Sequence, residues 1–401
     1  MLWLKFFLPF AAAYFLSYVF RTANAVIGPG LTQELALGAG GLGLLTSAYF
    51  LAFASVQLPL GMLLDRFGPR RVESGLLLIA TIGATVFAQG HGIGQLAIGR
   101  GLIGFGVSAC LMAAFKAFSL WFPPERQASL AGWIMTIGGL GALAATAPLE
   151  AVLQLVGWRD IFSVLAALTL AVSGWLFFGV PERAGTAKVD PLLAQWQGVK
   201  QVFSSAHFWR FAPLALMIYG GFMAVQSLWS ISWLMQVNGY PRAVAAQHLA
   251  AMSVAMLVSY MLIGLLATNL ARRGIKPITL LTGAMGLALL TLAVISTQAL
   301  DHTYLLWIAY GTFSSFSSLT YSQAAAGFPV ALSGRANTAI NLMVFLGAFG
   351  LQWGLGLLIE FLQTRGSDAA NAHRTVFLAL LGLQVVAYLW FCLAGRRAPR
   401  T

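Results

Sequence analysis

Arg21 is the side chain best placed to bind a ligand, because it lies inside an apolar stretch that runs from residue 3 to 31. In a helix it would lie about 24 Å beyond Lys5, at roughly 1.5 Å per residue. A guanidinium presents a planar fork of donors that matches a carboxylate or a phosphate. We therefore expect Arg21 to hold an anionic group. The alternative is a structural ion pair, or a side chain that reaches out to a polar surface.

Polar residues share one helical face with Arg21. At about 100° per residue, Tyr14, Ser17, Tyr18 and Asn24 lie on that face. A matching stripe occurs in the stretch 208–237, and its members are Tyr219, Met223, Gln226, Ser230 and Trp233. The substrate-binding residues that we expect from the two stripes are Arg21, Tyr14, Tyr18, Asn24, Tyr219, Gln226 and Trp233. Aromatic and amide stripes also occur in ordinary helix packing, so this reading stays open for the second stripe.

Three more ionisable residues could couple substrate movement to a second ion. Arg100 lies within the stretch 95–121, and Glu150 and Glu360 lie near the ends of 128–155 and 338–362. A buried carboxyl can bind and release a proton. Alternatively, each carboxylate pairs with a loop arginine, so both readings stay open.

A possible metal site and several enzyme motifs were weighed as well. His248, Met252 and Met256 recur at four-residue spacing, and imidazole and thioether ligands suit Cu(I). Methionine also packs well in apolar cores, so we expect no metal and no cofactor. The sequence contains no G-x-S-x-G, H-E-x-x-H or P-loop pattern, which argues against a hydrolase or an ATPase.

The composition of the chain indicates the kind of structure that must hold these residues in place. Of 401 residues, 59% are hydrophobic and 8% are charged, whereas soluble domains have about 25% charged residues. Apolar stretches of about 20 residues, enough for a helix to cross the hydrocarbon core, recur along the chain. Lipid offers no partners to backbone groups, and continuous apolar runs favour helices over a barrel. The protein is therefore expected to be an all-α integral membrane protein.

Polar, glycine, proline and charged clusters divide the chain into twelve predicted spans. They are 3–31, 43–64, 72–89, 95–121, 128–155, 161–180, 208–237, 245–270, 278–300, 303–328, 338–362 and 375–393. With both termini cytoplasmic, the outer loops hold only Arg159, Arg242, Arg365 and Arg374 of the loop arginines and lysines. Because positive charge is retained in the cytoplasm, both termini are expected there. The net charge of +12 thus reflects topology and implies no nucleic-acid partner.

An internal repeat divides the chain near its middle. The stretch RQASLAGWIMTIGGLG (126–141) matches RANTAINLMVFLGAFG (335–350) in the spacing of Arg and Gly. We expect an N-terminal six-helix bundle (1–181), a cytoplasmic inter-domain loop (182–207) and a C-terminal six-helix bundle (208–401). Parallel repeats of this kind are typical of one large transporter architecture.

Residues 61–71, GMLLDRFGPRR, closely resemble the signature loop between helices two and three of the major facilitator superfamily. Its matching residues are Gly61, Asp65, Arg66, Gly68, Arg70 and Arg71. Arg100 with Gly104 and Gly106 resembles the family's helix-four motif, and WFPPER (121–126) resembles its next loop. The resemblance implies twelve transmembrane helices in two six-helix pseudo-repeat bundles.

The resemblance also implies conformational roles for these loops. The gating residues that it indicates are Gly61, Asp65, Arg66, Gly68, Arg70, Arg71 and Arg126. Asp65 would face the N-terminal end of the eleventh helix, where the helix dipole favours a carboxylate. Gly61 and Gly68 would allow close packing and a tight turn.

The first helix indicates a substrate class. YVFRTANAVIGPGL (18–31) is similar to the first helix of the family's organic-anion branches, the organophosphate antiporters and anion:cation symporters, in which an Arg holds the anionic group. Phe20 stands where many of those symporters have an aspartate that binds a proton, which favours exchange or uniport over proton symport.

We therefore expect a secondary transporter that moves a small carboxylate or phosphate ester by alternating access, acting as a monomer in the bacterial inner membrane. A proton-coupled exporter of drugs or amphiphilic metabolites is the main alternative. A copper importer that uses His248, Met252 and Met256, or a non-transporting sensor on the same fold, are further alternatives.

Overall fold

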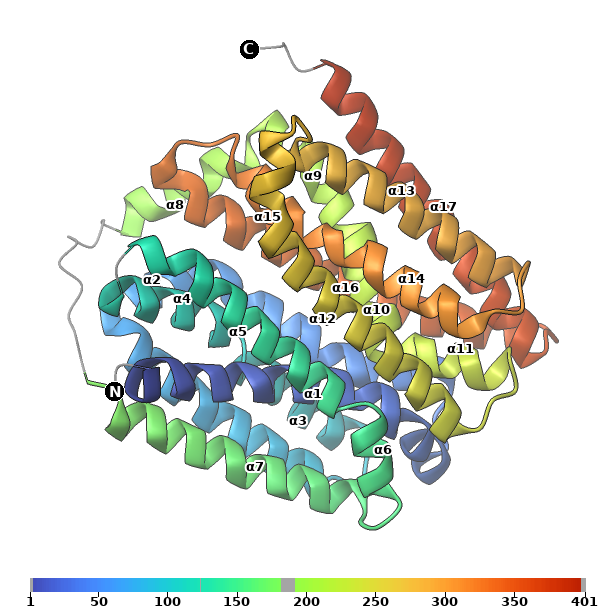
Figure 1. The fold of residues 1–401 in the computed structure, drawn as a ribbon. Coiled ribbons are helices and arrows are strands. Elements are labelled where there is room, and N and C mark those ends of the chain that lie inside the picture. The colour runs from blue at the N-terminus through green and yellow to red at the C-terminus, as the bar shows by residue number, and fades with distance from the viewer. Residues whose placement is uncertain (1–2, 123, 182–191, 398–401) are drawn as a thin grey trace.

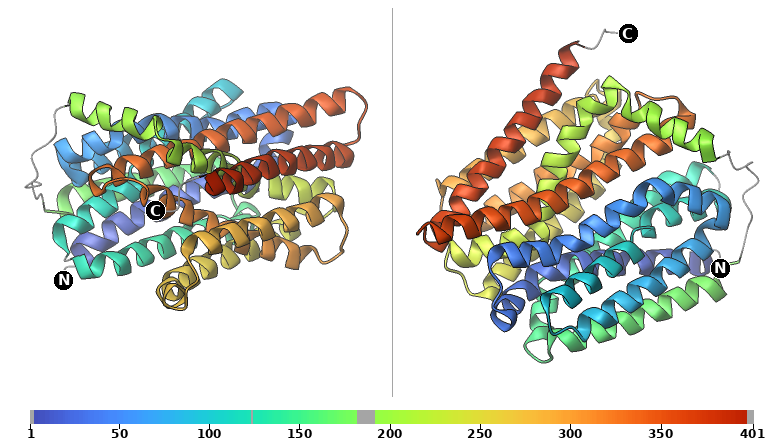
Figure 2. Two further views of the ribbon diagram at one scale, coloured as in Figure 1. Left: turned by 90° about the horizontal axis from the view of Figure 1, so that it is seen from above. Right: turned by 180° about the vertical axis from the view of Figure 1, so that it is seen from behind.

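A computed structural model describes residues 3–122, 124–181 and 192–397, which form helices joined by short turns (Figure 1). The N-terminal half contains α1 (Leu8–Leu35), α2 (Ala39–Ala88), α3 (Ile93–Gly106), α4 (Cys110–Trp121), α5 (Pro124–Ala144), α6 (Ala147–Leu153) and α7 (Trp158–Gly174). The C-terminal half contains α9 (Ala206–Leu214), α10 (Gly220–Ala224), α11 (Ser230–Gln236), α12 (Arg242–Arg272), α13 (Pro277–Thr297), α14 (Thr303–Ser315), α15 (Leu319–Ala325), α16 (Val330–Thr364) and α17 (Ala369–Arg397). The two halves lie side by side (Figure 2).

The described residues contain 11 helical segments that are long and apolar enough to cross a membrane. The predicted span 303–328 is the twelfth, but a 3₁₀ turn at Phe316–Ser318 divides it into α14 and α15. Hydroxyl groups explain the break, because Ser315 donates to the carbonyl of Gly311 and Ser318 to that of Ser315. Such bonds to the preceding turn compete with the helix and bend it. The expected twelve-helix fold is confirmed.

The predicted spans 43–64 and 72–89 run into one another as α2. The helical path is interrupted at Gly68, whose φ of +79° lies in the left-handed region, where glycine has no steric penalty. The tight turn expected at Gly68 is therefore confirmed. Close packing at Gly61 is not, because a Cβ added there would meet nothing within 4 Å.

Arg70, next to the turn at Gly68, makes its contacts within the N-terminal half. The Arg70 guanidinium donates to the Val180 carbonyl at 3.0 Å and lies 5.1 Å from the Phe177 ring. Arg66, Arg71 and Arg126 are exposed. The side chain of Asp65 lies outside the described residues, so its contact with the eleventh helix stays a prediction.

Helix α8 (Leu192–Phe203) lies within the predicted loop 182–207 and packs against α16. Its buried residues, Gly198 and Val202, are one turn apart, whereas Trp196 and Lys200 are exposed. This four-residue spacing makes one face apolar enough to dock. The predicted inter-domain segment therefore contains a helix that the sequence analysis did not indicate.

The helices run between two ends of the molecule, which are named here by the residues and helices that lie there. We call the end that holds Lys5, Arg70 and α8 the basic end, and the end that holds α6 and α11 the opposite end. Both chain ends lie toward the basic end (Figure 1).

Near the opposite end, α2 of one half packs closely on α16 of the other. The amide of Gly40 donates to Glu360 Oε2 at 2.9 Å. A Cβ on Gly43 would lie 2.9 Å from the Gln352 carbonyl oxygen, and a Cβ on Gly356 would collide with the backbone of Ala39. Glycine on both helices thus allows the two backbones to approach.

Candidate functional site

A cavity of about 970 Å³ lies between the two halves. From the N-terminal half it is lined by α1, α2, α4, α5 and the turn between α3 and α4, and from the C-terminal half by helix 7 (206–236), α12, α15 and α16. The lining residues Leu265, Ser322 and Gly334, toward the basic end, are exposed, whereas Tyr14 and Tyr18 are buried. The cavity therefore reaches the basic end and is closed at the opposite end.

Arg21 carries the only charge among the described residues that line this cavity. Its guanidinium carbon lies 3.7 Å from the centroid of the Tyr18 ring, a cation–π contact. Tyr14 donates to the Tyr18 hydroxyl at 3.3 Å. None of the ion pairs or hydrogen bonds found among the described residues involves Arg21. The fork of the guanidinium is thus available to a ligand.

Four of the seven predicted substrate-binding residues meet in the cavity, namely Tyr14, Tyr18, Arg21 and Tyr219. Asn24, Gln226 and Trp233 do not line it. Asn24 is 1% exposed, further along α1. Gln226 donates to the Met256 sulfur at 3.4 Å, and Trp233 packs on Phe377 with ring centroids 4.4 Å apart. For these three residues, the predicted contact with the cavity is not found in this conformation.

The shape of helix 7 explains why its stripe was predicted only in part. Two π-helical turns, Ala215–Tyr219 and Val225–Trp229, interrupt it. Each π turn accommodates one additional residue, so the regular spacing of about 100° per residue does not hold along the whole of helix 7. Tyr219 and Met223 line the cavity, whereas Gln226 inside the second turn and Trp233 after it do not.

The structure adds polar lining residues that the two stripes did not indicate. They are Tyr260 on α12, Tyr321 on α15, and Asn337 and Asn341 on α16. Asn341 accepts from the Tyr321 hydroxyl at 2.5 Å and donates to Gln57 of α2 at 2.6 Å, across the two halves. The run of hydroxyl residues at 311–323 was a signal for Tyr321, because Tyr310, Ser314, Ser317 and Tyr321 share one helical face.

Arg100 lies beside the cavity without lining it. It is fully buried, donates to the Phe20 carbonyl at 3.0 Å, and lies 5.0 Å from the Tyr49 ring. It therefore links α3 to α1. Its coupling role stays a prediction.

Glu150 joins the two halves at the opposite end. Its Oε2 forms an ion pair with Arg242 Nε of α12 at 2.7 Å, and its Oε1 accepts from Gln154 at 2.8 Å. The glutamate side chain is 6% exposed. Glu150 and Glu360 both lie at contacts between the halves, and their coupling role stays a prediction.

We expect Glu150→Gln and Arg242→Gln to be non-additive. Contacting residues have interaction energies of about 0.5–3 kcal/mol, and here the pair is partly shielded from water. Thermal unfolding of the purified single and double variants measures this energy. Glu150→Gln combined with Arg365→Gln, an exposed arginine at the same end, is the control and should be additive. Additivity in the first cycle would show that the pair contributes nothing.

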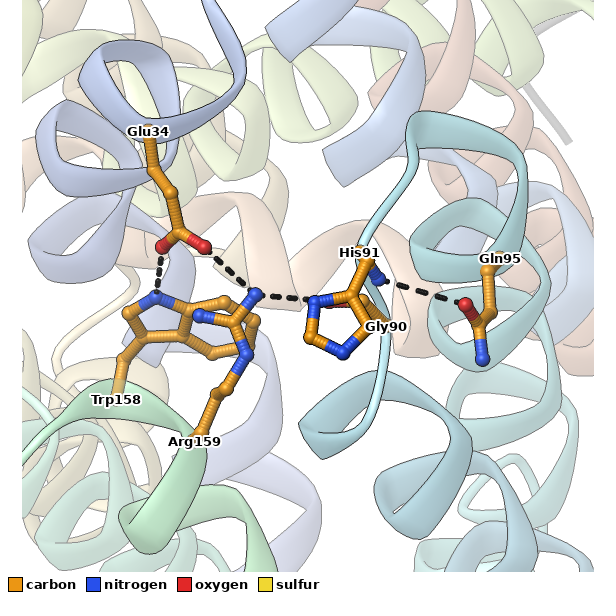
Figure 3. Close-up of polar contacts among 6 residues, drawn as sticks. All are labelled: Glu34, Gly90, His91, Gln95, Trp158 and Arg159. Carbon is orange, nitrogen blue, oxygen red and sulfur yellow. Dashed lines mark hydrogen bonds and ion pairs between the residues drawn. The ribbon is translucent and has the colours of Figure 1, made fainter.

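A second polar cluster at the opposite end stays within the N-terminal half (Figure 3). Glu34 of α1 forms an ion pair with Arg159 at 2.6 Å and accepts from the Trp158 indole at 2.8 Å. Arg159 also donates to the Gly90 carbonyl at 2.9 Å. The cluster ties the ends of α1, α2 and α7 together.

The copper hypothesis is not favoured by the geometry. The two ring nitrogens of His248 are within hydrogen-bond distance of the Val244 carbonyl at 2.8 Å and the Thr303 hydroxyl at 3.0 Å. Met252 and Met256 are buried and do not line the cavity. Neither ring nitrogen is free to bind Cu(I).

Comparisons with known proteins agree with this architecture. A family model described as Major Facilitator Superfamily matches residues 10–351. The chain is 25% identical over 276 residues to the probable sulfoacetate transporter SauU of Cupriavidus necator, an alignment that covers 65% of this chain and 64% of that protein. It is 27% identical over 161 residues to the probable L-galactonate transporter of Escherichia coli, covering 40% and 36%. The chain thus spans less than two thirds of the length of either relative.

The fold also matches solved structures. A bacterial homologue of the human lysosomal transporter Spinster, solved in an inward-facing and unoccupied conformation, superposes with a TM-score of 0.75 at 17% identity. The match covers 98% of both chains.

Proposed function

The chain belongs to the Major Facilitator Superfamily, and from this premise we propose that it moves a small organic anion, a carboxylate or a phosphate ester, by alternating access. It is a multi-pass membrane transporter and not an enzyme. The observation that carries the proposal is the guanidinium of Arg21, which enters the central cavity without an acidic partner among the described residues.

Electrostatics connects this geometry to an anionic substrate. A charge held away from bulk water is costly unless it is paired. A bidentate carboxylate or phosphate offsets that cost with two charge-assisted hydrogen bonds. The relatives named for sulfoacetate and L-galactonate, both organic acids, support the same class.

We assign the basic end to the cytoplasm of a bacterial cell, with both termini on that side of the inner membrane. The support is the distribution of arginine and lysine, since positive loops are retained inside. Because the cavity reaches the basic end, the conformation described here would then be inward-facing. The contacts of Glu150, Glu360 and Gly43 would close the periplasmic side.

Exchange or uniport fits the cavity better than proton symport. The described lining contains no aspartate or glutamate. Phe20 is fully buried and packs on Phe162 with ring centroids 6.0 Å apart, so this position offers no proton site. The alternative of a proton-coupled exporter therefore has no carboxyl in the described cavity wall to support it.

Transport in proteoliposomes tests this coupling. We expect uptake of labelled anion, with benzoate and cyclohexanecarboxylate as probes, to be driven by the same anion inside the vesicle. A protonophore should change the rate of exchange less than twofold. Anion uptake that is strictly dependent on a proton gradient would contradict the exchange mode, and uptake of cations alone would contradict the function.

A further inference from the structure

The chemistry of the cavity wall says more about the ligand than its charge. Arg21 is the only ionisable cation among the described lining residues, and lysine, histidine, aspartate and glutamate do not occur among them. One anionic group can therefore be neutralised. A second anionic group would be moved from water to an apolar wall without a partner, which is strongly unfavourable.

Four of the ten hydroxyl groups among the described lining residues donate a hydrogen bond to a backbone carbonyl three or four residues earlier in the chain. The donations are Ser108 to Phe105 at 2.7 Å, Thr136 to Gly132 at 3.0 Å, Ser318 to Ser315 at 2.8 Å and Ser322 to Leu319 at 3.1 Å, each to a backbone carbonyl. The phenols of Tyr14 and Tyr321 also donate to neighbouring side chains. A ligand with many hydroxyl groups needs a partner for each one, and six of the ten lining hydroxyls already donate within the protein.

The rest of the wall is apolar and deformable. Its methionines are Met112, Met135, Met223 and Met261, and its large rings without a hydroxyl are Phe53, Phe115, Trp133 and Phe345. Methionine adapts its shape to a ligand and makes favourable contacts with aromatic rings. A cavity of about 970 Å³ also has room for more than a two-carbon acid, since pockets of about 300–1,000 Å³ bind drug-sized molecules.

We propose that the substrate is an amphiphilic monoanion, with one carboxylate or sulfonate on Arg21 and an aromatic or alicyclic body against the methionines and phenylalanines. The proposal rests on the organic-anion function above and narrows it. It excludes polyhydroxylated acids and dianions as preferred substrates. Met112 and Met261 would determine specificity, because they come from opposite halves and face the same space.

Matched ligands test each part of the proposal by thermal stabilisation of the purified protein. Glucuronate differs from cyclohexanecarboxylate mainly in carrying hydroxyl groups on the ring. Isophthalate differs from benzoate in carrying a second carboxylate, and benzamide differs from benzoate in having no charge. We expect cyclohexanecarboxylate and benzoate to bind at least tenfold more tightly than the other compound of each pair. Arg21→Gln should abolish the binding of cyclohexanecarboxylate and of benzoate.

A variant of the wall provides a second measurement. Met112→Gln should weaken benzoate and cyclohexanecarboxylate severalfold, while Met62→Gln, a half-buried methionine outside the cavity, should leave both unchanged. If glucuronate or isophthalate binds as tightly as its partner and still depends on Arg21, the amphiphilic class is overturned and the anion function stands. If no anion depends on Arg21, both are overturned.

Discussion

Replacing Arg21 with glutamine is expected to abolish the stabilisation of the purified protein by anions and to leave its fold intact. The guanidinium forms none of the ion pairs or hydrogen bonds found among the described residues, so folding loses only its contact with the Tyr18 ring. The ligand loses much more. Breaking a buried charge pair by removing one partner costs about 3–5 kcal/mol, which corresponds to at least a hundredfold in affinity.

Arg21→Lys separates charge from geometry. Lysine retains the positive charge but lacks the planar fork, so we expect an affinity between those of the wild type and Arg21→Gln. Arg365→Gln removes an exposed arginine at the opposite end and is the matched control. The measurement is the shift of the melting temperature with anion concentration. An unchanged anion response in Arg21→Gln would contradict the assignment of this residue.

Gly43→Ala opens the opposite end. Its Cβ would lie 2.9 Å from the Gln352 carbonyl oxygen and 3.3 Å from the Trp353 Cα, both backbone atoms of the other half. Overpacking of this kind costs about 1–3 kcal/mol, so the population open at this end should rise about tenfold. The expectation holds for the transporter in detergent, where either end is accessible to reagents.

Cysteine labelling measures this change. Leu228 is 2% exposed, and a Cβ on Gly28 of the first half would lie 3.4 Å from its side chain, so Leu228→Cys reports separation of the halves. The background replaces Cys110 and Cys392 with serine. Gly75→Ala on the same helix, where a Cβ would meet nothing within 4 Å, is the control. Equal labelling rates in the two variants would refute the proposed wedge, and retained anion binding shows that Gly43→Ala is folded.

The sequence predicted the residues of α1 better than those of helix 7 for a physical reason. Helix α1 is continuous from Leu8 to Leu35, so a regular 100° spacing places Tyr14, Tyr18 and Arg21 on the cavity face. In helix 7, local π turns change the spacing. The first turn packs against α16 and the second mainly against α1, and a single sequence does not reveal such partners.

The sequence also did not predict which charged residues form ion pairs with one another in the folded protein. The loop motif, the composition and the repeat predicted the twelve-helix fold, because lipid restricts a chain to apolar spans. Glu150 was expected to pair with a loop arginine or to carry a proton, and the arginine that it contacts is Arg242, 92 positions away in the other half. Arg159 instead pairs with Glu34. Such choices follow from how the helices assemble rather than from the local sequence.

The interruption of the tenth helix affects whether the number of membrane crossings is counted as odd or even. Counting continuous apolar helices gives 11 crossings, and an odd number would place the two chain ends on opposite sides of the bilayer. The turn at Phe316–Ser318 bends the path without reversing it, so α14 and α15 together make one further crossing. The even total returns the chain to the side on which it began. The serine hydroxyls thus split one crossing into two helices that are each too short to be counted as a span. The side of the membrane on which each chain end lies is not changed by this split.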